Sequence, residues 1–447
     1  MKTPISDFID GYRGRAPLRL HMPGHKGLGE TESKDITEIA GADVLYRSHG
    51  IIRASEENAA KLFGSARTVY SAEGSSLCVR GMLYLALLQA RKQNRPPMIL
   101  AGRNAHRSLM TACALLDCGV EWLYGTDRTT CLPSPEEVEA VLKRREGGVA
   151  AVYLTSPDYL GNRVDIRGIA RVCRKYGVPL LVDNAHGAYL RFLPEDLHPL
   201  TLGADMTCDS AHKTLPVLTG GAYLHISAEA PCLFREQAER ALSLFASTSP
   251  SYLILRSLDR ANAVLAGEYR TRLEIFSRET ALLKQRLRDH GYTLRGDEPL
   301  KITVAAKAFG YTGDELHALL RKDNLECEFS DPDYLVMMVT PETGTEGLRR
   351  MEKALLSIRR REPAGGDQPP LPRPEQVLSI REAMLADSEK VSREESLGRI
   401  LADAAVSCPP AVPIVVCGER ISREAIACFR YYGEPESLLC VREDGCV

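Results

Sequence analysis

Short apolar runs alternate with amphipathic stretches from about residue 50 to residue 226. Each run is apolar on both faces and bounded by turn residues, which is typical of strands in a parallel sheet covered on both sides. The runs are Met98–Ala101, Val120–Tyr124, Ala150–Leu154, Pro179–Val182 and Ala222–Ile226. Helical periodicity lies between them, for example in Pro135–Arg145 and Ile166–Tyr176. The alternation predicts an α/β layered domain.

The pattern changes after Ser249-Pro250, where residues 251 to about 290 predict one or two long helices. A small α/β unit follows, then a Pro- and Gly-rich stretch that is typical of a linker, then a short α/β tail. The predicted organisation is an arm at 1–40, a large domain at 41–255, a linking helix and small domain at 256–361, a linker at 362–374 and a C-terminal domain at 375–447.

Composition and charge exclude several classes of protein. The 57 basic and 59 acidic residues give a net charge of -2, which favours neither nucleic acid nor an anionic membrane as a partner. No apolar run approaches the roughly 20 residues of a membrane span, and the N-terminus lacks the apolar core of a secretory signal. The 13 cysteines show no C-x-x-C spacing. We therefore expect a cytoplasmic protein with mostly buried free thiols, without a disulfide framework or a metal site.

Lys213 is the first candidate for chemistry. It lies in CDSAHKT, Cys208–Thr214, which follows a predicted strand. A desolvated lysine can act as a nucleophilic amine and hold an aldehyde cofactor. Ser210 and His212 could reach an anion such as a phosphate. The alternative is an ordinary surface lysine in a loop.

Asp183 and His186 lie in LLVDNAHG, where a predicted buried strand ends. Ligands of open α/β sheets bind just beyond the carboxyl ends of the strands. A carboxylate in this place could keep a pyridine ring protonated, so that the ring acts as an electron sink. The alternatives are an N-cap aspartate and a histidine that only caps a loop.

Two further segments follow predicted strands or begin helices. SAEGSS places Gly74, Ser75 and Ser76 at a helix start, where backbone N–H groups, hydroxyls and the helix dipole favour a phosphate. GRNAHRS places His106 where an imidazole could stack on a flat ring. An ordinary serine N-cap and an ordinary loop histidine are the alternatives. The order of phosphate seat, stacking ring, acid and lysine favours one common site.

Five segments together resemble motifs of the Orn/Lys/Arg decarboxylase family, within the aspartate-aminotransferase-like fold of pyridoxal-phosphate enzymes. They are HMPGHKG (His21–Gly27), TSPDYLG (Thr155–Gly161), DNAHG (Asp183–Gly187), SAHKTLP (Ser210–Pro216) and STSPSY (Ser247–Tyr252). The resemblance covers nearly the whole chain. It implies a large domain with a mainly parallel seven-stranded sheet, a small α/β domain and a C-terminal α/β tail.

The resemblance also implies roles for single residues. Lys213 would hold pyridoxal 5'-phosphate as a Schiff base, Asp183 would pair with the pyridine nitrogen, His106 would stack on the ring and His186 would lie beside it. The residues implied to hold the phosphate are Gly74, Ser75, Ser76, Ser210 and His212. Ser249 would reach the cofactor of a neighbouring subunit, which implies a homodimer with shared active sites.

The predicted activity is decarboxylation of arginine, lysine or ornithine to CO₂ and a di- or polyamine precursor, with arginine favoured by resemblance to the short form of the family. Candidates for contact with the substrate are His25, Asp158, Glu419 and Glu73. Departures from the family pattern are Asn184, where Glu is usual, and Cys408, Ala411 and Cys417 in the tail. The alternatives are an aminotransferase or lyase of the same fold, a decarboxylase of a modified basic amino acid, and a non-catalytic cofactor-binding protein.

Overall fold

The computed structural model describes residues 1–447 apart from 128, 367, 409–411, 434 and 444–447. Ala411 and the side chain of Cys408 therefore lie outside the described part of the chain. The chain folds into two compact units, each built from discontinuous segments. Unit 1 comprises Met1–Pro96, Ala150–Ser156 and Ile166–Glu274, and unit 2 comprises Pro97–Val149, Pro157–Asp165 and Ile275–Val447. Among the described helices, none combines the length and the apolarity needed to cross a membrane.

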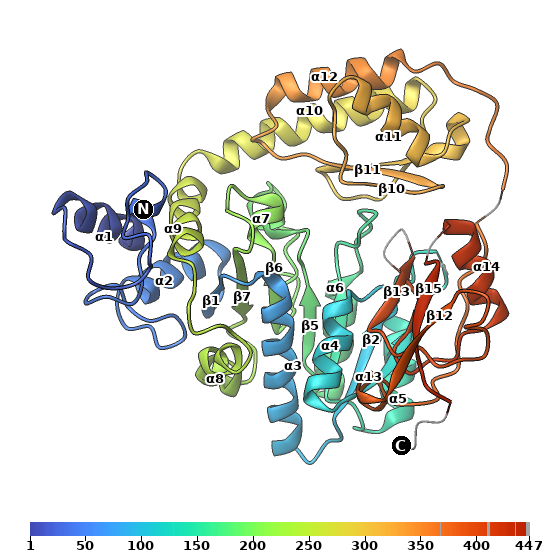
Figure 1. Ribbon diagram of the computed structural model, residues 1–447, viewed down its shortest axis with the longest axis horizontal. Coiled ribbons are helices and arrows are strands. Elements are labelled where there is room, and N and C mark those ends of the chain that lie inside the picture. Colours follow the sequence, from blue (N-terminus) through green and yellow to red (C-terminus); the bar gives the residue numbers. More distant parts are fainter. Residues whose placement is uncertain (128, 367, 409–411, 434, 444–447) are drawn as a thin grey trace. The chain divides into compact units, whose positions relative to one another are not determined.

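Seven strands form one mixed sheet in the order β1-β7-β6-β5-β4-β2-β3 (Figure 1). They are β1 (Arg67–Ser71), β2 (Met98–Gly102), β3 (Gly119–Leu123), β4 (Ala151–Thr155), β5 (Leu180–Asp183), β6 (Met206–Asp209) and β7 (Ala222–Ile226). The pairs β2–β3, β4–β5 and β5–β6 are parallel, whereas β7 runs antiparallel to β6 and to β1. The expected α/β fold with a mainly parallel seven-stranded sheet is confirmed.

Strand direction in unit 1 brings several turns to one edge of the sheet. Because β7 is antiparallel to both β6 and β1, strand β1 runs in the same direction as β4, β5 and β6. The register aligns Asp183 with Thr155 of β4 and with Cys208 of β6. The turns that lead to Ser75, to His186 and to Lys213 therefore start at the same edge, where open α/β sheets bind ligands.

Helices of unit 1 cover these strands. They are α1 (Pro4–Gly14), α2 (Ile51–Phe63), α3 (Gly74–Lys92), α6 (Ile166–Tyr176), α7 (Ala211–Thr214), α8 (Cys232–Ser243) and α9 (Tyr252–Ala266), with 3₁₀ turns η1 (Glu32–Lys34) and η2 (Ala188–Phe192).

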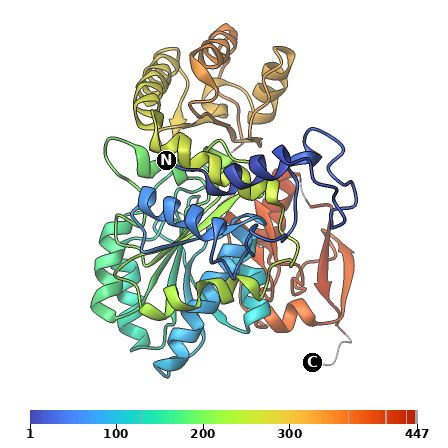
Figure 2. The ribbon, with the colours of Figure 1, turned by 90° about the vertical axis from the view of Figure 1, so that its left-hand side faces the viewer.

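The arm begins with α1, which packs against α2 and α9 (Figures 1 and 2). Pro4 starts this helix, and Ile5, Ile9 and Tyr12 recur at helical spacing and are buried. The arm is therefore more regular than its Gly- and Pro-rich composition suggests.

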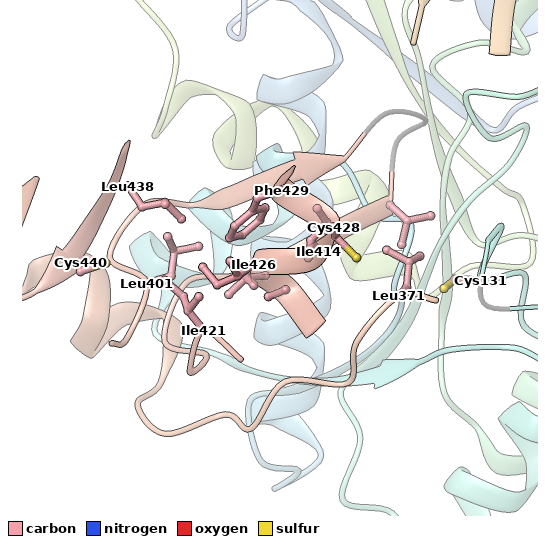
Figure 3. Close-up of a cluster of buried hydrophobic side chains, with 13 residues drawn as sticks. Cys131, Leu371, Leu401, Ile414, Ile421, Ile426, Cys428, Phe429, Leu438 and Cys440 are labelled. Carbon is pink, nitrogen blue, oxygen red and sulfur yellow. The ribbon is translucent and has the colours of Figure 1, made fainter. Parts of the chain in front are cut away.

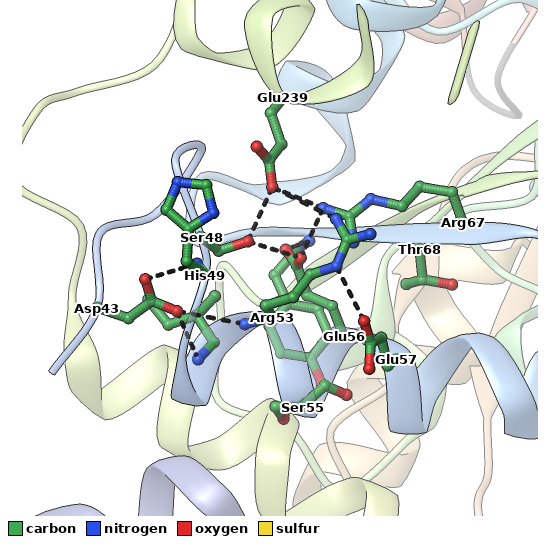
Figure 4. A network of polar contacts seen from close by, with 12 residues as sticks. Asp43, Ser48, His49, Arg53, Ser55, Glu56, Glu57, Arg67, Thr68 and Glu239 are labelled. Atoms are coloured by element: carbon green, nitrogen blue, oxygen red, sulfur yellow. Dashed lines mark hydrogen bonds and ion pairs between the residues drawn. The ribbon is translucent and has the colours of Figure 1, made fainter. Parts of the chain in front are cut away.

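A partly buried polar network ties helices α2 and α8 of unit 1 to strand β1 (Figure 4). The Arg67 guanidinium on β1 lies 3.0 Å from Glu56 of α2 and 2.6 Å from Glu239 of α8. Asp43 accepts backbone N–H groups of Gly50 and Ile52 at the start of α2, which satisfies donors that the helix itself leaves unpaired.

Unit 2 contains a second sheet, in the order β10-β11-β9-β8, with helices α11 and α12 and most of α10 (Figure 1). These elements are β8 (Leu294–Arg295), β9 (Lys301–Ala305), β10 (Phe329–Ser330), β11 (Tyr334–Met338), α10 (Tyr269–Asp289), α11 (Gly313–Lys322), α12 (Gly344–Ser357) and the 3₁₀ turn η3 (Ala306–Phe309). Pairing within this sheet is antiparallel. The helices α4 (Arg107–Leu116) and α5 (Pro135–Arg145) also belong to unit 2.

The C-terminal segment of unit 2 forms two antiparallel strand pairs and two helices. They are β12 (Ser388–Ser392) with β15 (Ser437–Val441), β13 (Ala405–Cys408) with β14 (Val412–Val416), α13 (Ile380–Leu385) and α14 (Arg423–Tyr432). Its apolar core gathers Ile414, Ile426 and Phe429 and extends to Cys131 of the loop after β3 (Figure 3). Apolar burial thus joins the end of the chain to a segment that precedes it by about 300 residues.

Candidate active site

The start of helix α3 offers a seat for an anion in unit 1. Gly74 has a φ of +72°, which suits glycine, and a Cβ placed on it would meet no heavy atom of the described residues within 4 Å. The residue before it, Glu73, makes no side-chain cap. The hydroxyl of Ser210 donates to that of Ser75 at 2.8 Å. The N–H of Gly74 donates to the Gly220 carbonyl at 2.8 Å, so the dipole of the 19-residue helix and the paired hydroxyls are the features that favour an anion here.

Asp183 is a buried carboxylate with three donors of its own unit. Its Oδ2 accepts the Tyr153 hydroxyl at 3.1 Å, and its Oδ1 accepts the Ala185 N–H at 3.1 Å and the Cys208 thiol at 3.5 Å. Burial, and then the neighbouring Asp183, raise the pKa of Cys208 well above its usual value, so Cys208 remains a thiol donor. The carboxylate of Asp183 is thus held in place by three hydrogen bonds at the end of β5.

Lys213 lies in the short helix α7 and is exposed. Its Nζ donates to Nε2 of His186 at 2.9 Å, so the two predicted residues are in contact. The neighbouring His212 is held by the backbone, because its Nδ1–H donates to the Gly221 carbonyl at 3.0 Å. The structure therefore brings together Lys213 with His186 and, through the same turn, Ser210 with Ser75.

Ser249 and His25 lie in other parts of unit 1. Ser249 is exposed, and its N–H donates to the Ser247 hydroxyl at 3.1 Å. The N–H of Ser247 donates to Glu73 at 2.8 Å, which joins the STSPSY segment to the residue before the anion seat. His25 accepts the Gly27 N–H on Nδ1, so its Nε2 carries the proton and donates to Asp35 at 3.2 Å. His25 thereby fixes a turn of the arm.

His106 and Asp158 belong to unit 2. His106 is exposed and caps α4, since its Nδ1 accepts the Ser108 N–H at 3.2 Å. Asp158 is buried and accepts both the backbone N–H and the side-chain amide of Asn162 at 2.7 Å. Burial raises the pKa of Asp158, although the bonds from Asn162 oppose that shift. Its carboxylate shapes the turn after β4.

Glu419 forms a buried ion pair in unit 2. Its two oxygens accept the Arg103 guanidinium at 2.6 and 2.8 Å, and one of them also accepts the Val416 N–H at 2.8 Å. Arg103 donates further to the carbonyls of Pro413 and Ile414. The pair therefore fastens the C-terminal segment to the residue after β2. Nearby, the buried thiol of Cys417 donates to the Ala402 carbonyl at 3.3 Å.

Sequence reasoning missed several residues of the unit 1 site. Tyr153 and Cys208 hold Asp183, and Asp209 forms a buried group with Asn184 and His198. A polar side chain inside a short apolar strand run could have indicated these residues. Such a side chain needs a hydrogen-bond partner when it is buried. Tyr153 lies in the run Ala150–Leu154, and Cys208 and Asp209 are the first two residues of the segment that carries Lys213.

Comparison with known proteins agrees with this geometry. Residues 4–347 match the family described as Orn/Lys/Arg decarboxylase, major domain, and residues 371–437 match its C-terminal domain. The chain is 29% identical over 466 residues to the uncharacterized protein YaaO of Bacillus subtilis strain 168, covering 95% of this chain and 93% of the relative. It is 28% identical over 469 residues to arginine decarboxylase of the same organism, covering 95% and 92%.

Among solved structures, the constitutive lysine decarboxylase of E. coli has the same fold. The TM-score is 0.78 at 17% identity, with 99% of this chain and 82% of that chain covered. A second neighbour, described as a NifS-like protein, has a TM-score of 0.56 at 14% identity and covers 80% of this chain. The likeness supports the aspartate-aminotransferase-like fold expected from the sequence.

Proposed function

The chain belongs to the Orn/Lys/Arg decarboxylase family, and from that premise we propose that it removes the α-carboxylate of arginine, lysine or ornithine. The products are CO₂ and an amine that keeps the distal cation of the substrate. Relatives named arginine decarboxylase favour arginine among the three. The observation that carries the proposal is the contact of Lys213 with His186, on the sheet edge that also holds the clamped Asp183.

Enzymes of this family depend on pyridoxal phosphate, and residues of unit 1 fit that group. The open turn at Gly74 and the Ser75–Ser210 hydroxyl pair suit a phosphate. Asp183 suits the ring nitrogen, and the amine of Lys213 suits an aldehyde. When bound, the cofactor supplies an electron sink for the bond that releases CO₂.

The protein's own groups supply binding and proton transfer. With the cofactor bound, Asp183, whose two oxygens are held by three donors, would stabilise positive charge at the ring nitrogen. His186 accepts a hydrogen bond from Lys213 and can therefore exchange a proton with it. We infer that Lys213 or His186 delivers the proton to Cα after CO₂ leaves.

The distal cation of the substrate needs an acidic partner, and the candidates differ in how their oxygens are engaged. Glu419 already balances Arg103, and Asp158 accepts two bonds from Asn162. Glu73 is exposed, and its Oε1 accepts the N–H of Ser247. We therefore propose that Glu73 is the first to test. Glu73→Gln should raise KM for basic amino acids several-fold at nearly constant kcat, as expected for lost ground-state binding.

The direct test is a panel of amino acids in which CO₂ release is measured and the amine products are identified by mass. A keto acid in place of CO₂ would favour an aminotransferase, and a neutral or acidic amino acid as the best substrate would contradict the substrate class. Borohydride reduction followed by peptide mapping should find the cofactor on Lys213, and an adduct on another lysine would overturn that assignment.

Asp183→Asn should lower kcat by roughly a hundredfold or more, about 3 kcal/mol of barrier, because the ring nitrogen loses its anionic partner. Asp205→Asn is the matched control. Asp205 lies at the other end of the same strand pair, where it accepts the Leu180 N–H at 2.8 Å. Near-normal turnover of Asp183→Asn, or an equal loss in both variants, would contradict the role of Asp183.

We also propose a homodimer with shared active sites. The arm supports it, because Leu18, Leu20, Met22 and Leu28 are 70–89% exposed and form an apolar stretch that water disfavours. A chain with Lys213→Ala can be combined with one in which Ser247, Thr248 and Ser249 are alanine. If the hydroxyls serve the partner's cofactor, one pocket of the mixed dimer is intact and activity partly returns. No recovery in verified mixed dimers would place the hydroxyls outside the partner's site.

A further inference from the structure

A second buried carboxylate of unit 1, Asp209, lies four residues before Lys213. Its Oδ1 accepts the side-chain amide of Asn184 at 2.9 Å, and its Oδ2 accepts Nε2–H of His198 at 2.8 Å. His225 of β7 lies 3.6 Å from the same Oδ2. All four side chains are fully buried. A charge without water must be stabilised by such donors.

Protonation in this group follows from its hydrogen bonds. Nδ1 of His198 accepts the Leu200 N–H at 3.2 Å, so the ring proton is on Nε2, directed at Asp209. Burial raises the pKa of Asp209, but His198 and His225 outweigh it and leave that pKa well below the usual range. His198, Asp209 and His225 have the composition of a metal site. The proton on Nε2 of His198 occupies the lone pair that a metal would need, so hydrogen bonding is the better interpretation.

The bond between Asn184 and Asp209 spans two turns of the proposed site. Asn184 directly follows Asp183 and precedes His186, whereas Asp209 directly precedes Ser210 and the helix of Lys213. The backbone adds one link, from the Asn184 N–H to the Cys208 carbonyl at 2.9 Å. The side-chain bond therefore ties the turn that carries the acid and the histidine to the turn that carries the lysine.

The side chain at 184 must be a donor. Asp209 is ionised and can only accept, and the remaining oxygen of Asn184 has no partner among the described residues. A carboxylate at 184 would face Asp209 in a buried place, where two like charges repel strongly. This accounts for Asn184 at a position where the family motif usually has Glu.

We propose that Asp209 is a positioning residue that fixes the turn of Lys213 against the turn of Asp183 and His186, with Asn184 as its required partner. The inference rests on the proposed function, because it gives Lys213 to the cofactor. Asp209 is not expected to contact the substrate. It acts by keeping the cofactor-binding groups in place before the cofactor arrives.

The test is a double-mutant cycle on the cofactor-loaded enzyme, with Asn184→Asp, Asp209→Asn and the two combined. The readouts are the dissociation constant of pyridoxal phosphate and the pH midpoint of its absorbance on the protein. Asn184→Asp should raise the dissociation constant about tenfold, and the combined variant should return within about threefold of the wild type, because a donor and an acceptor face each other again. Asp209→Asn should shift the pH midpoint. The control Asp205→Asn should leave both readouts unchanged within about twofold.

Three outcomes would overturn the inference. They are unchanged binding and absorbance in both single variants, effects that simply multiply in the combined variant, and an equal change in Asp205→Asn. If Asn184→Asp does not fold, the result for Asp209→Asn alone tests the inference. That substitution keeps the shape of the side chain and removes only its charge. Failure of the wild type to hold the cofactor on Lys213 would instead overturn the proposed function together with this inference.

Discussion

Two buried arginines, one in each unit, are neutralised in different ways. Arg103 of unit 2 meets one carboxylate, Glu419, in a two-point contact. Arg67 of unit 1 is shared between Glu56 at 3.0 Å and Glu239 at 2.6 Å (Figure 4). In the first group one guanidinium meets one carboxylate, whereas in the second Arg67 is shared by two carboxylates, one of which, Glu239, also lies 3.9 Å from Arg53.

The difference determines how each group responds to protons. At Arg103, burial lowers the pKa of the guanidinium, but Glu419 outweighs it and the pKa lies above its usual value. At Glu56, burial raises the pKa to about 7, Arg67 and the Tyr70 N–H oppose the rise, and Glu239 adds to it. An arginine that is shared cannot fully stabilise a buried carboxylate. The free energy of unfolding of unit 1 is therefore predicted to depend on pH near neutrality, because Glu56 titrates there.

The largest effect is expected from Glu419→Gln, which leaves Arg103 buried without a counter-charge. Removing one partner of a buried pair costs roughly 3–5 kcal/mol of the free energy of unfolding. The only tryptophan, Trp122, lies with its ring 5.1 Å from the Arg103 guanidinium, so urea unfolding followed by tryptophan fluorescence reports this region.

The matched control for that variant is Glu375→Gln. Glu375 pairs with Arg420 at 3.0 Å, but both side chains are substantially exposed. Its loss should cost less than about 1 kcal/mol. Equal costs for the two variants would remove the distinction between a balanced buried pair and a surface pair.

An intermediate effect, visible as pH dependence, is expected from Glu56→Gln. The folded pKa of about 7 lies above the unfolded value near 4.5, so folded Glu56 keeps its proton longer and stability falls as pH rises between these values. Wild type should lose roughly 2 kcal/mol of unfolding free energy from pH 5 to pH 8 through this group. Glu56→Gln should flatten that dependence in urea unfolding followed by circular dichroism. An unaltered pH profile would show that Glu56 does not titrate in this range.

The smallest effect is expected from Glu239→Gln. Glu239 is partly exposed, so its removal should change the free energy of unfolding by only about 0.5–1 kcal/mol. Without it, Arg67 serves Glu56 alone, and the pH at which stability falls should move downward. A shift of that midpoint to higher pH would contradict the account of a shared arginine.

The seven-stranded sheet was largely predictable, because five of its strands appear in the sequence as short apolar runs. Within the seven-stranded sheet, the two strands absent from the predicted apolar runs carry buried polar groups: β1 contains Arg67 and Thr68, and β6 contains Thr207 and Asp209. The partners of these polar groups come from distant segments, so no local sequence pattern predicts the two strands. The helix in the arm was hidden by its Gly and Pro content, although Ile5, Ile9 and Tyr12 repeat at helical spacing.

The candidate site was predictable where chemistry follows a strand. Lys213, Asp183 and Ser75 were chosen as candidates because each follows a predicted strand. The contact of Lys213 with His186 agrees with that choice. Their roles toward a cofactor stay predictions. The Arg103–Glu419 pair and the Asn184–Asp209 bond depend on contacts between segments 316 and 25 residues apart, which sequence spacing alone does not reveal.

The long sequence separation of Arg103 from Glu419 affects when the two residues can pair during synthesis of the chain. A ribosome adds about 5–20 residues per second, so Glu419 is synthesised roughly 16–63 s after Arg103. During that interval the guanidinium has neither its carboxylate nor the carbonyls of Pro413 and Ile414. The end of β2 therefore cannot bury Arg103 until almost the whole chain exists. The time needed to translate the 316 residues from Arg103 to Glu419 therefore sets the earliest moment at which this part of unit 2 can reach its native packing.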